Sequence, residues 1–321
     1  MEFSGKSVVV TGGAGFIGSH VVDALVSGGA SVTIIDNFST GYRELVPPRP
    51  QVTLIEGDLL DFPLVSGAMK GQDFVFHLAA NADVKDGLLH PRKDVEQNII
   101  ATQNVLEGMR AHGVRRIAFS STGALYGDAP ILPTPEDCPF PIQTSLYGAS
   151  KVAAEGLLTA YAFGYDFQTW IFRFVSLLGP RYSHGHIIDF WRQLRKDPKV
   201  LHVLGDGHQR KSYLNVADCV RGMLVAVKAA GTTNINIYNL GHTAMCEVNE
   251  SIRIICGELG LSPEIRYGGG ERGWIGDAPR ILLDTKKLGS LGWSPTKAIP
   301  ESIVETVRFI EQNPFLHKKQ G

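Results

Sequence analysis

The segment from Thr11 to Gly18 constrains the fold of this chain most strongly. It reads TGGAGFIG, directly follows the β-branched run Ser7–Thr11 and opens an amphipathic pattern over Phe16–Ser27. Glycines between a strand and a helix allow a tight turn, a close approach of the backbone to a pyrophosphate, and close packing of the helix on the strand. The N–H groups at the start of such a helix attract phosphates. The segment therefore predicts a dinucleotide-binding βαβ unit.

The rest of the N-terminal half alternates short β-branched runs with helical patterns. The runs cover Ser31–Asp36, Gln51–Gly57, Asp73–Ala79, Arg115–Ser121 and the longer Thr169–Leu178; the helical patterns cover Pro63–Lys70, Val95–Ala111 and Ser145–Phe163. Strands separated by helix-length segments indicate a parallel sheet with helices on both faces. We therefore predict an α/β chain in which residues 1–178 form a Rossmann-type, doubly wound parallel sheet.

Beyond Gly179 the pattern is less regular, with shorter elements and more glycine and proline. Helices are expected at His186–Arg195, Val216–Ala230, Val248–Leu259 and Pro300–Gln312. We predict that residues 179–321 form mainly a smaller substrate-binding domain, partly interleaved with the first.

Composition argues against several classes of partner. The 321 residues include 31 Lys and Arg against 32 Asp and Glu, and this formal net charge of −1 favours neither nucleic acid nor an acidic membrane surface. No apolar stretch is long enough to cross a membrane, and no cleavable signal precedes the first strand. The four cysteines show no CxxC pair and no metal-ligand spacing with histidine, so we expect no metal and no disulfide framework. A cytoplasmic location follows from these expectations.

Asp36 ends the second expected strand. A carboxylate at this place hydrogen-bonds the adenosine ribose hydroxyls and repels a 2′-phosphate. The next residues, Asn37 and Phe38, supply no arginine for such a phosphate. The sequence therefore favours NAD over NADP.

Tyr147 and Lys151 lie four residues apart on an expected helix, and hence on one of its faces. Free tyrosine has a pKa of about 10, and a nearby ammonium stabilises the phenolate and lowers that pKa. This spacing alone is common on surface helices, and it indicates a catalytic pair only in combination with the dinucleotide motif. Ser120, Ser121 and Thr122 end the fifth expected strand, where ligands of open α/β sheets bind, although such hydroxyls also simply begin turns.

Together these segments resemble the extended short-chain dehydrogenase/reductase family, in particular its NDP-sugar epimerases and dehydratases. The resemblance covers essentially the whole chain, and its further markers are residues 36–41, Gly57-Asp58, His77-Leu78-Ala79-Ala80, Asn98 and Gly205-Asp206-Gly207 before Tyr213. It implies NAD as cofactor, a UDP-sugar as substrate and a homodimer. The dimer would be a four-helix bundle built from the helices around Val95–Ala111 and Ser145–Phe163, which otherwise simply pack on the sheet.

The motifs and the resemblance together give three sets of site residues. The catalytic set is Thr122, Tyr147 and Lys151. The cofactor set is Gly12, Gly15, Phe16, Ile17, Gly18, Asp36, Asn37, Ser39, Thr40, Gly41, Asp58, Leu59, Leu78, Ala79, Ala80, Asn98 and Ser120, with Tyr147 and Lys151. The substrate set is Ser121, Thr122, Ser176, Lys211, Tyr213 and Arg272.

Two substrate positions depart from the family pattern. Ser176 stands where an asparagine is usual, and Lys211 stands where an arginine commonly grips the phosphates, which loses the bidentate fork but keeps the charge. Arg272 matches a diphosphate-binding arginine.

The family reaction begins with oxidation at C4 of the sugar, and three outcomes then compete: 4-epimerisation, 4,6-elimination and 5,6-elimination. Gly123-Ala124 stand where 4,6-dehydratases carry an Asp-Glu pair, which leaves 4-epimerisation favoured by the motif. The whole chain, however, resembles the UDP-N-acetylglucosamine 5,6-dehydratase type of tunicamycin biosynthesis.

Our first expectation follows that resemblance: 5,6-dehydration of UDP-N-acetylglucosamine in antibiotic biosynthesis, with hydride returned to C4. A UDP-hexose or UDP-N-acetylhexosamine 4-epimerase is the alternative, and a non-catalytic NAD-binding regulator is the alternative of another class. Spacing does not assign the acid and base of an elimination; Glu136, Asp137 and Cys138 are candidates.

Overall fold

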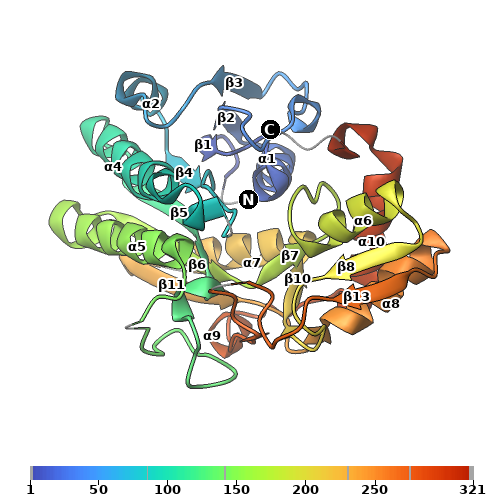
Figure 1. Ribbon diagram of the computed structural model, residues 1–321. Coiled ribbons are helices and arrows are strands. Elements are labelled where there is room, and N and C mark those ends of the chain that lie inside the picture. The colour runs from blue at the N-terminus through green and yellow to red at the C-terminus, as the bar shows by residue number, and fades with distance from the viewer. Residues whose placement is uncertain (1–2, 85, 141, 230, 275, 318–321) are drawn as a thin grey trace.

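Seven parallel strands form the central sheet, in the order β11-β6-β5-β4-β1-β2-β3 (Figure 1). The structure is a computed structural model that describes residues 3–317, except 85, 141, 230 and 275. The strands are β1 Ser7–Thr11, β2 Ser31–Asp36, β3 Val52–Glu56, β4 Phe74–His77, β5 Arg116–Thr122, β6 Gln168–Phe174 and β11 Ile235–Leu240. Every neighbouring pair is parallel. The predicted Rossmann-type sheet is thus confirmed.

Helices cover both faces of this sheet (Figure 1). Helices α1 Phe16–Ser27 and α7 Val216–Ala229 pack together on one face, and α2 Phe62–Ala68, α4 Ala101–Ala111 and α5 Leu146–Tyr165 cover the other. The side chains of β1 alternate accordingly: Val8 and Val10 belong to the first hydrophobic core, and Val9 belongs to the second. Because both faces of the inner strands are buried, those strands are largely apolar.

The expected strand over Thr169–Leu178 is two strands. β6 ends at Phe174, and β7 Ser176–Leu178 leaves the main sheet and pairs in parallel with β10 Tyr213–Asn215. Val175, between them, donates its backbone N–H to the carbonyl of Leu240. The apolar run continues across the break because both strands are buried.

β11 is a strand that the sequence reading did not include. Its sequence, INIYNL, carries two asparagines in a buried strand. Asn236 Nδ2 donates to the carbonyl of Thr233 at 2.7 Å, and Asn239 Nδ2 donates to that of Thr134 at 2.9 Å. These bonds satisfy the buried amides.

The remaining elements lie mostly beside the carboxyl edge of the main sheet. They are α3 Pro91–Asp94, a π-helical segment Val95–Ile100, α6 His186–Lys196, β8 Val200–Val203, β9 Arg210–Lys211, β12 Cys246–Glu247, α8 Val248–Leu259, β13 Glu264–Tyr267, β14 Arg280–Ile281, α9 Lys286–Gly289 and α10 Ile299–Gln312. β13 pairs with β8, and β9 lies between β12 and β14. Short 3₁₀ turns occupy Arg43–Leu45, Asp86–Leu88, Gly123–Tyr126 and Pro314–His317.

Two parts of the chain are interleaved, since α7 and β11 return to the main sheet from beyond residue 178. The domain limits given from the sequence stay a prediction. Residue 230, the expected end of the helix from Val216, lies outside the described residues.

Within the described residues, no helix is long and apolar enough to cross a membrane. The same part of the chain holds no group of three or more His, Cys, Asp or Glu placed to bind a metal ion. All four cysteines are buried free thiols.

Candidate active site

The glycine turn is shaped by close backbone approaches. Gly12 has φ +69°, and a Cβ there would lie 2.8 Å from the backbone nitrogen of Ala79. A Cβ at Gly18 would lie 2.0 Å from the carbonyl oxygen of Gly12. Gly15 precedes α1, and none of the described side chains caps that end of the helix. The first N–H groups of α1 therefore face the turn without a side-chain partner, as a phosphate site requires.

Asp36 is anchored at the carboxyl end of β2. Its Oδ2 accepts from the N–H of Ala14 and its Oδ1 from the N–H of Phe38, both at 2.9 Å. Burial raises the pKa of Asp36, and these two backbone hydrogen bonds partly offset that rise. A Cβ at Gly41 would lie 2.9 Å from Oδ1. The carboxylate is thus held beside the glycine turn, where a ribose would lie.

A second polar group lies beyond the ends of β2 and β3. Asn37 Nδ2 donates to Asp58 at 2.9 Å, and the N–H of Ser39 donates to Asn37 Oδ1 at 3.0 Å. Asp58 also accepts from the N–H of Leu60 at 2.9 Å. The structure thus brings together two of the predicted adenosine-side residues, Asn37 and Asp58, and Leu59 between Asp58 and Leu60 is buried.

The end of β4 is fixed to the end of β1 by His77. Its Nδ1 lies 2.8 Å from Thr11 Oγ1 and its Nε2 lies 3.0 Å from Thr102 Oγ1. Complete burial lowers the pKa of His77 to about 3, so the ring is neutral. The N–H groups of Leu78 and Ala79 both donate to Thr11 Oγ1 at 3.2 Å. These contacts hold Leu78 and Ala79, two of the predicted cofactor residues, against the turn.

Asn98 lies in the π-helical segment, a distortion that is frequent at functional sites. Its Oδ1 accepts from the N–H of Asn81 at 2.8 Å, and its Nδ2 donates to Ser150 Oγ at 2.9 Å. Ser150 Oγ donates in turn to the carbonyl of Tyr147 at 2.8 Å. Asp94, fully buried, accepts from Asn81 Nδ2 at 2.9 Å. The sequence analysis did not identify Asn81 and Asp94, and the only local signal is the His77-Leu78-Ala79-Ala80 stretch directly before Asn81.

The predicted catalytic residues converge at the carboxyl end of β5. Thr122 ends the strand, and its side chain hydrogen-bonds with that of Tyr147 on α5. Lys151 Nζ lies 6.0 Å from the Tyr147 ring centroid and 4.6 Å from that of Phe119, and it donates to the carbonyl of Ser120 at 2.8 Å. The arrangement places a phenol, a hydroxyl and an ammonium together, as proton transfer to and from a substrate oxygen requires.

The electrostatics of this pair differ from the expectation. Burial raises the pKa of Tyr147 to about 12, and the hydrogen bond with Thr122 only partly opposes it. Burial also lowers the pKa of Lys151 to about 7, against the charges of Glu155 and Asp94. A lowered tyrosine pKa was expected from the ammonium, but burial raises the pKa of Tyr147, and the ammonium of Lys151 donates to the carbonyl of Ser120.

The predicted substrate residues are distributed around the other side of the site. Ser176 begins β7 and is the register partner of Tyr213 on β10. Burial raises the pKa of Tyr213 above its usual range. Lys211 Nζ pairs with Asp277 Oδ1 at 2.5 Å. The hydroxyl of Ser121 donates to the buried carboxylate of Glu155. The role of Ser121 as a substrate contact stays a prediction.

Arg272 makes two contacts at the same place. Its Nη2 and Nη1 lie 2.8 and 3.1 Å from the two carboxylate oxygens of Asp128, and Nη1 also donates to the carbonyl of Asp277 at 2.6 Å. Lys211 and Arg272 therefore meet at Asp277, and a phosphate that binds Arg272 would have to displace Asp128.

The candidates for an elimination acid or base are engaged elsewhere or exposed. The Glu136 carboxylate accepts from the N–H of Asn239 at 2.9 Å, and the buried Cys138 thiol lies 3.6 Å from the carbonyl of Pro139. Asp137 is exposed.

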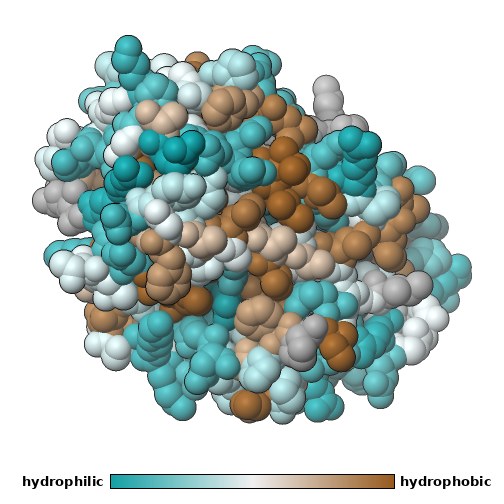
Figure 2. All heavy atoms as spheres, turned by 90° about the vertical axis from the view of Figure 1, so that its left-hand side faces the viewer, coloured by the Kyte–Doolittle hydropathy of each residue, from teal (hydrophilic) through white to brown (hydrophobic). Residues whose placement is uncertain are grey.

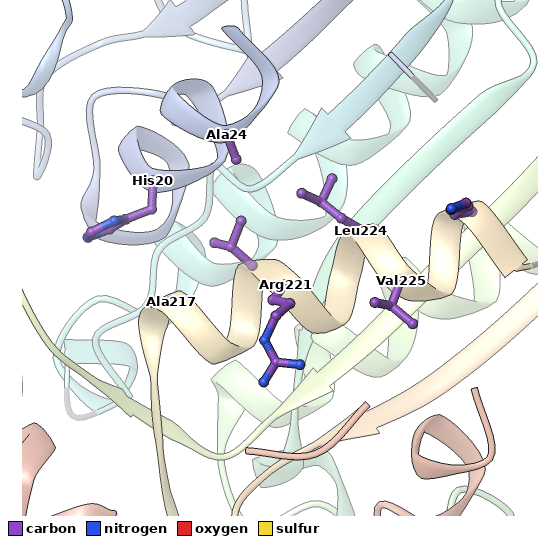
Figure 3. Close-up of a pocket in the computed structure, with 8 residues that line it drawn as sticks. His20, Ala24, Ala217, Arg221, Leu224 and Val225 are labelled. Atoms are coloured by element: carbon purple, nitrogen blue, oxygen red, sulfur yellow. The ribbon is translucent and has the colours of Figure 1, made fainter. Parts of the chain in front are cut away.

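A hollow of about 460 Å³ between α1 and α7 is separate from this site (Figure 3). His20 and Ala24 of α1 and Arg221, Leu224 and Val225 of α7 line it. None of its lining residues belongs to the glycine turn or to the catalytic set.

Comparison with known proteins decides the family. The model of the NAD dependent epimerase/dehydratase family matches residues 8–241. This chain belongs to that family. Its relatives include a UDP-glucose 4-epimerase of Corynebacterium glutamicum, which is 31% identical over 316 residues that cover 93% of each protein. Two UDP-glucuronic acid decarboxylases of Arabidopsis thaliana are also among them, as is a trifunctional protein of the same plant whose name includes UDP-glucose 4,6-dehydratase.

Solved structures give the same picture. A UDP-galactose 4-epimerase is 40% identical, with a TM-score of 0.87, over 95% of this chain and 99% of the other. A Thermotoga maritima UDP-glucose 4-epimerase, solved with UDP-glucose, is 31% identical with a TM-score of 0.86 over the same shares.

The chain is therefore an NAD-dependent enzyme of the extended short-chain dehydrogenase/reductase type that acts on nucleotide-sugars. The glycine turn, the uncapped start of α1 and the anchored Asp36 fit NAD, and they are the residues that would hold its pyrophosphate and ribose. The regulator alternative has no support among these relatives.

Proposed function

We propose that this enzyme is a UDP-sugar 4-epimerase. The observation that carries the proposal is the catalytic cluster at the end of β5, which has a hydroxyl, a phenol and an ammonium but no neighbouring carboxylate pair. A Cβ at Gly123 would lie 3.2 Å from the carbonyl oxygen of Phe174 and 3.3 Å from the Leu283 side chain. An acidic side chain directly after Thr122 would therefore be crowded. The epimerase relatives support the same conclusion.

The residues present suffice for oxidation and reduction at one carbon. Bound NAD supplies the chemistry that takes a hydride from the sugar C4 and later returns it. Tyr147 accepts the proton of the 4-hydroxyl as the ketone forms, and it gives the proton back when the carbonyl is reduced. Thr122 shares a hydrogen bond with the same oxygen, and Lys151 stabilises the phenolate. Inversion follows when the ketose presents its other face.

This choice replaces our first expectation, 5,6-dehydration. That reaction needs a base at C5 and an acid for the 6-hydroxyl. Glu136 and Cys138 are engaged with Asn239 and Pro139, as described above, so neither supports an elimination. We keep UDP-N-acetylglucosamine beside UDP-glucose as a candidate substrate of the epimerase.

The test is proton NMR of the purified protein incubated with UDP-glucose, and separately with UDP-N-acetylglucosamine, in deuterated water. The proposal predicts the small H4 couplings of a galacto product without solvent deuterium at C5. Vinylic methylene signals would show 5,6-dehydration instead and would overturn it.

We also propose that the enzyme is a cytoplasmic homodimer. Helices α4 and α5 lie side by side on one face, with Val95 and Ile100 exposed just before α4, and Phe163 and Tyr165 exposed near the end of α5. Figure 2 shows hydrophobic side chains gathered across the face that lies at the left in Figure 1. A second copy would bury such a surface. The four free thiols agree with a reducing compartment.

A further inference from the structure

A buried ion pair lies one helical turn beyond Lys151. Glu155 follows that lysine by four residues on α5, and Arg173 lies on β6. Arg173 Nη2 lies 2.7 Å from Glu155 Oε2, and its Nε lies 3.1 Å from Oε1. The two side chains are only 3% and 8% exposed. Neither residue touches the reacting oxygen in the mechanism above.

The pair reaches the catalytic strand through Ser121. The Ser121 hydroxyl donates to Glu155 Oε1, and Ser121 is the register partner of Arg173 in the sheet. The residues on either side of Ser121 make the catalytic contacts. The carbonyl of Ser120 accepts from Lys151, and the side chain of Thr122 hydrogen-bonds with that of Tyr147. Three consecutive residues of β5 are therefore tied to three residues at successive turns of α5.

Arg173 extends the same network to two further segments. Its Nη1 donates to the Tyr126 hydroxyl at 2.7 Å and to the Glu136 carbonyl at 2.8 Å. The Tyr126 hydroxyl donates to Asn239 Oδ1 at 3.0 Å. A buried ion pair adds little stability relative to well-packed apolar side chains, because desolvation costs about as much as the attraction returns. Stability alone is thus a weak reason for this pair.

We propose that Glu155 and Arg173 are positioning residues that act through Ser121. They fix the end of β5, with its catalytic threonine, against the face of α5 that carries the catalytic tyrosine and lysine. The proposal rests on the proposed epimerase function for its kinetic test.

Glu155 also supplies charge close to the catalytic lysine. The titratable groups that face Lys151 are Tyr147 and Glu155 on α5, Asp94 on α3 and the neutral His77 on β4. Burial lowers the pKa of Lys151 to about 7, and Glu155 is the largest opposing influence. Without that carboxylate the pKa falls further, so the ammonium is lost at a lower pH. The alkaline limb of the kcat profile then moves to lower pH.

The test uses one double variant, one single variant and a matched control for each. Glu155→Leu with Arg173→Met removes both charges and leaves no buried charge uncompensated. Ser121→Ala removes the hydroxyl that links Glu155 to β5 and keeps both charges of the ion pair. Glu258→Leu with Arg308→Met is the control pair, which joins α8 to α10 away from the site. The control for the serine is Ser290→Ala, whose exposed hydroxyl donates to the Lys287 carbonyl.

In the full-length enzyme, the double variant is expected to lose about 100-fold in kcat, as small misplacements of catalytic groups do. Its KM for the UDP-sugar should change little, and its alkaline limb should move to lower pH. Ser121→Ala should lose less in kcat, again with little change in the KM for the UDP-sugar. If both keep the kcat and pH profile of their controls, the pair is structural only. If the double variant does not fold, Ser121→Ala alone decides.

A second measurement does not depend on turnover. The ¹³C signal of the Tyr147 Cζ, assigned with Tyr147→Phe, reports the hydrogen bond with Thr122 at fixed pH. We expect that signal to move in Ser121→Ala and to stay in Ser290→Ala. An unmoved signal in Ser121→Ala would contradict the positioning role, whether or not the wild-type protein epimerises a UDP-sugar. A wild-type protein without epimerase activity would refute the proposed function, separately from the positioning role.

Discussion

At the scale of single residues, the site depends on a few side chains whose partners come from neighbouring elements of the fold. Tyr147 illustrates this, because its hydroxyl meets Thr122 while its backbone carbonyl accepts from Ser150. Its phenol is held un-ionised by burial in this structure. The proton transfers proposed here therefore require the charge of Lys151 beside it.

Tyr147→Phe tests the proton-transfer role. Removing a positioned acid–base group costs about 10²- to 10⁴-fold in rate, so kcat should fall by that factor. NAD affinity, measured by titration calorimetry, should stay near the wild-type value, because the phenylalanine keeps the packing. A variant that keeps full turnover would exclude Tyr147 as the acid and base.

Gly18→Ala tests the cofactor turn. The added methyl would lie 2.0 Å from the Gly12 carbonyl oxygen, so the turn must shift and NAD binding should be lost. Gly67→Ala on α2 is the control, since its Cβ meets nothing within 4 Å. That variant should bind NAD normally and gain up to about 1 kcal/mol in unfolding free energy. Equal NAD affinity in both variants would show that the turn does not hold the cofactor.

At the scale of elements, the loop that carries Arg272 is joined to the loop after β5 by the Asp128 pair. Both side chains are about half exposed. Such pairs contribute at most about 1 kcal/mol. The pair is therefore weak enough for a phosphate to replace.

Asp128→Asn should release Arg272 and strengthen UDP binding by up to about fivefold, the factor that about 1 kcal/mol allows. Titration calorimetry with UDP at low and high salt measures this, and the gain should shrink as salt rises. Glu56→Gln, which breaks the exposed pair with Arg43, is the control. Weaker UDP binding in Asp128→Asn would mean that Asp128 helps to hold the ligand.

The elements also show what the sequence predicts and what it does not. The first five strands were placed to within two residues, because short runs rich in β-branched and aromatic side chains leave a clear pattern. β11 was missed because Asn236 and Asn239 make a buried strand look polar. The glycine turn follows from its spacing between a strand and a helix, whereas the catalytic set depends on the family resemblance as well as on the spacing of Tyr147 and Lys151. Asn81, Asp94 and Glu155 act through hydrogen bonds between distant segments, and no local pattern marks them.

At the scale of the whole molecule, the proposed dimer would join the α4–α5 faces of two copies. Phe163 is 84% exposed on α5, and exposed apolar side chains that gather in one patch mark an interaction surface. Burying it against a second copy would explain its exposure.

Phe163→Glu should therefore convert a dimer of about twice 34.9 kDa into a monomer in light scattering coupled to size exclusion. Leu54→Glu, on the edge strand β3, is the control and should leave the mass unchanged. A wild-type protein that is already monomeric across the measured concentrations would contradict the dimer.

The central claim is that oxidation and reduction take place at one sugar carbon, C4, with the same hydride returned to it. UDP-glucose deuterated at C4 tests it directly, with the product followed by NMR and mass spectrometry. The account predicts UDP-galactose that keeps its deuterium at C4 and gains none from solvent. Loss of the C4 label, or a product unsaturated between C5 and C6, would contradict it.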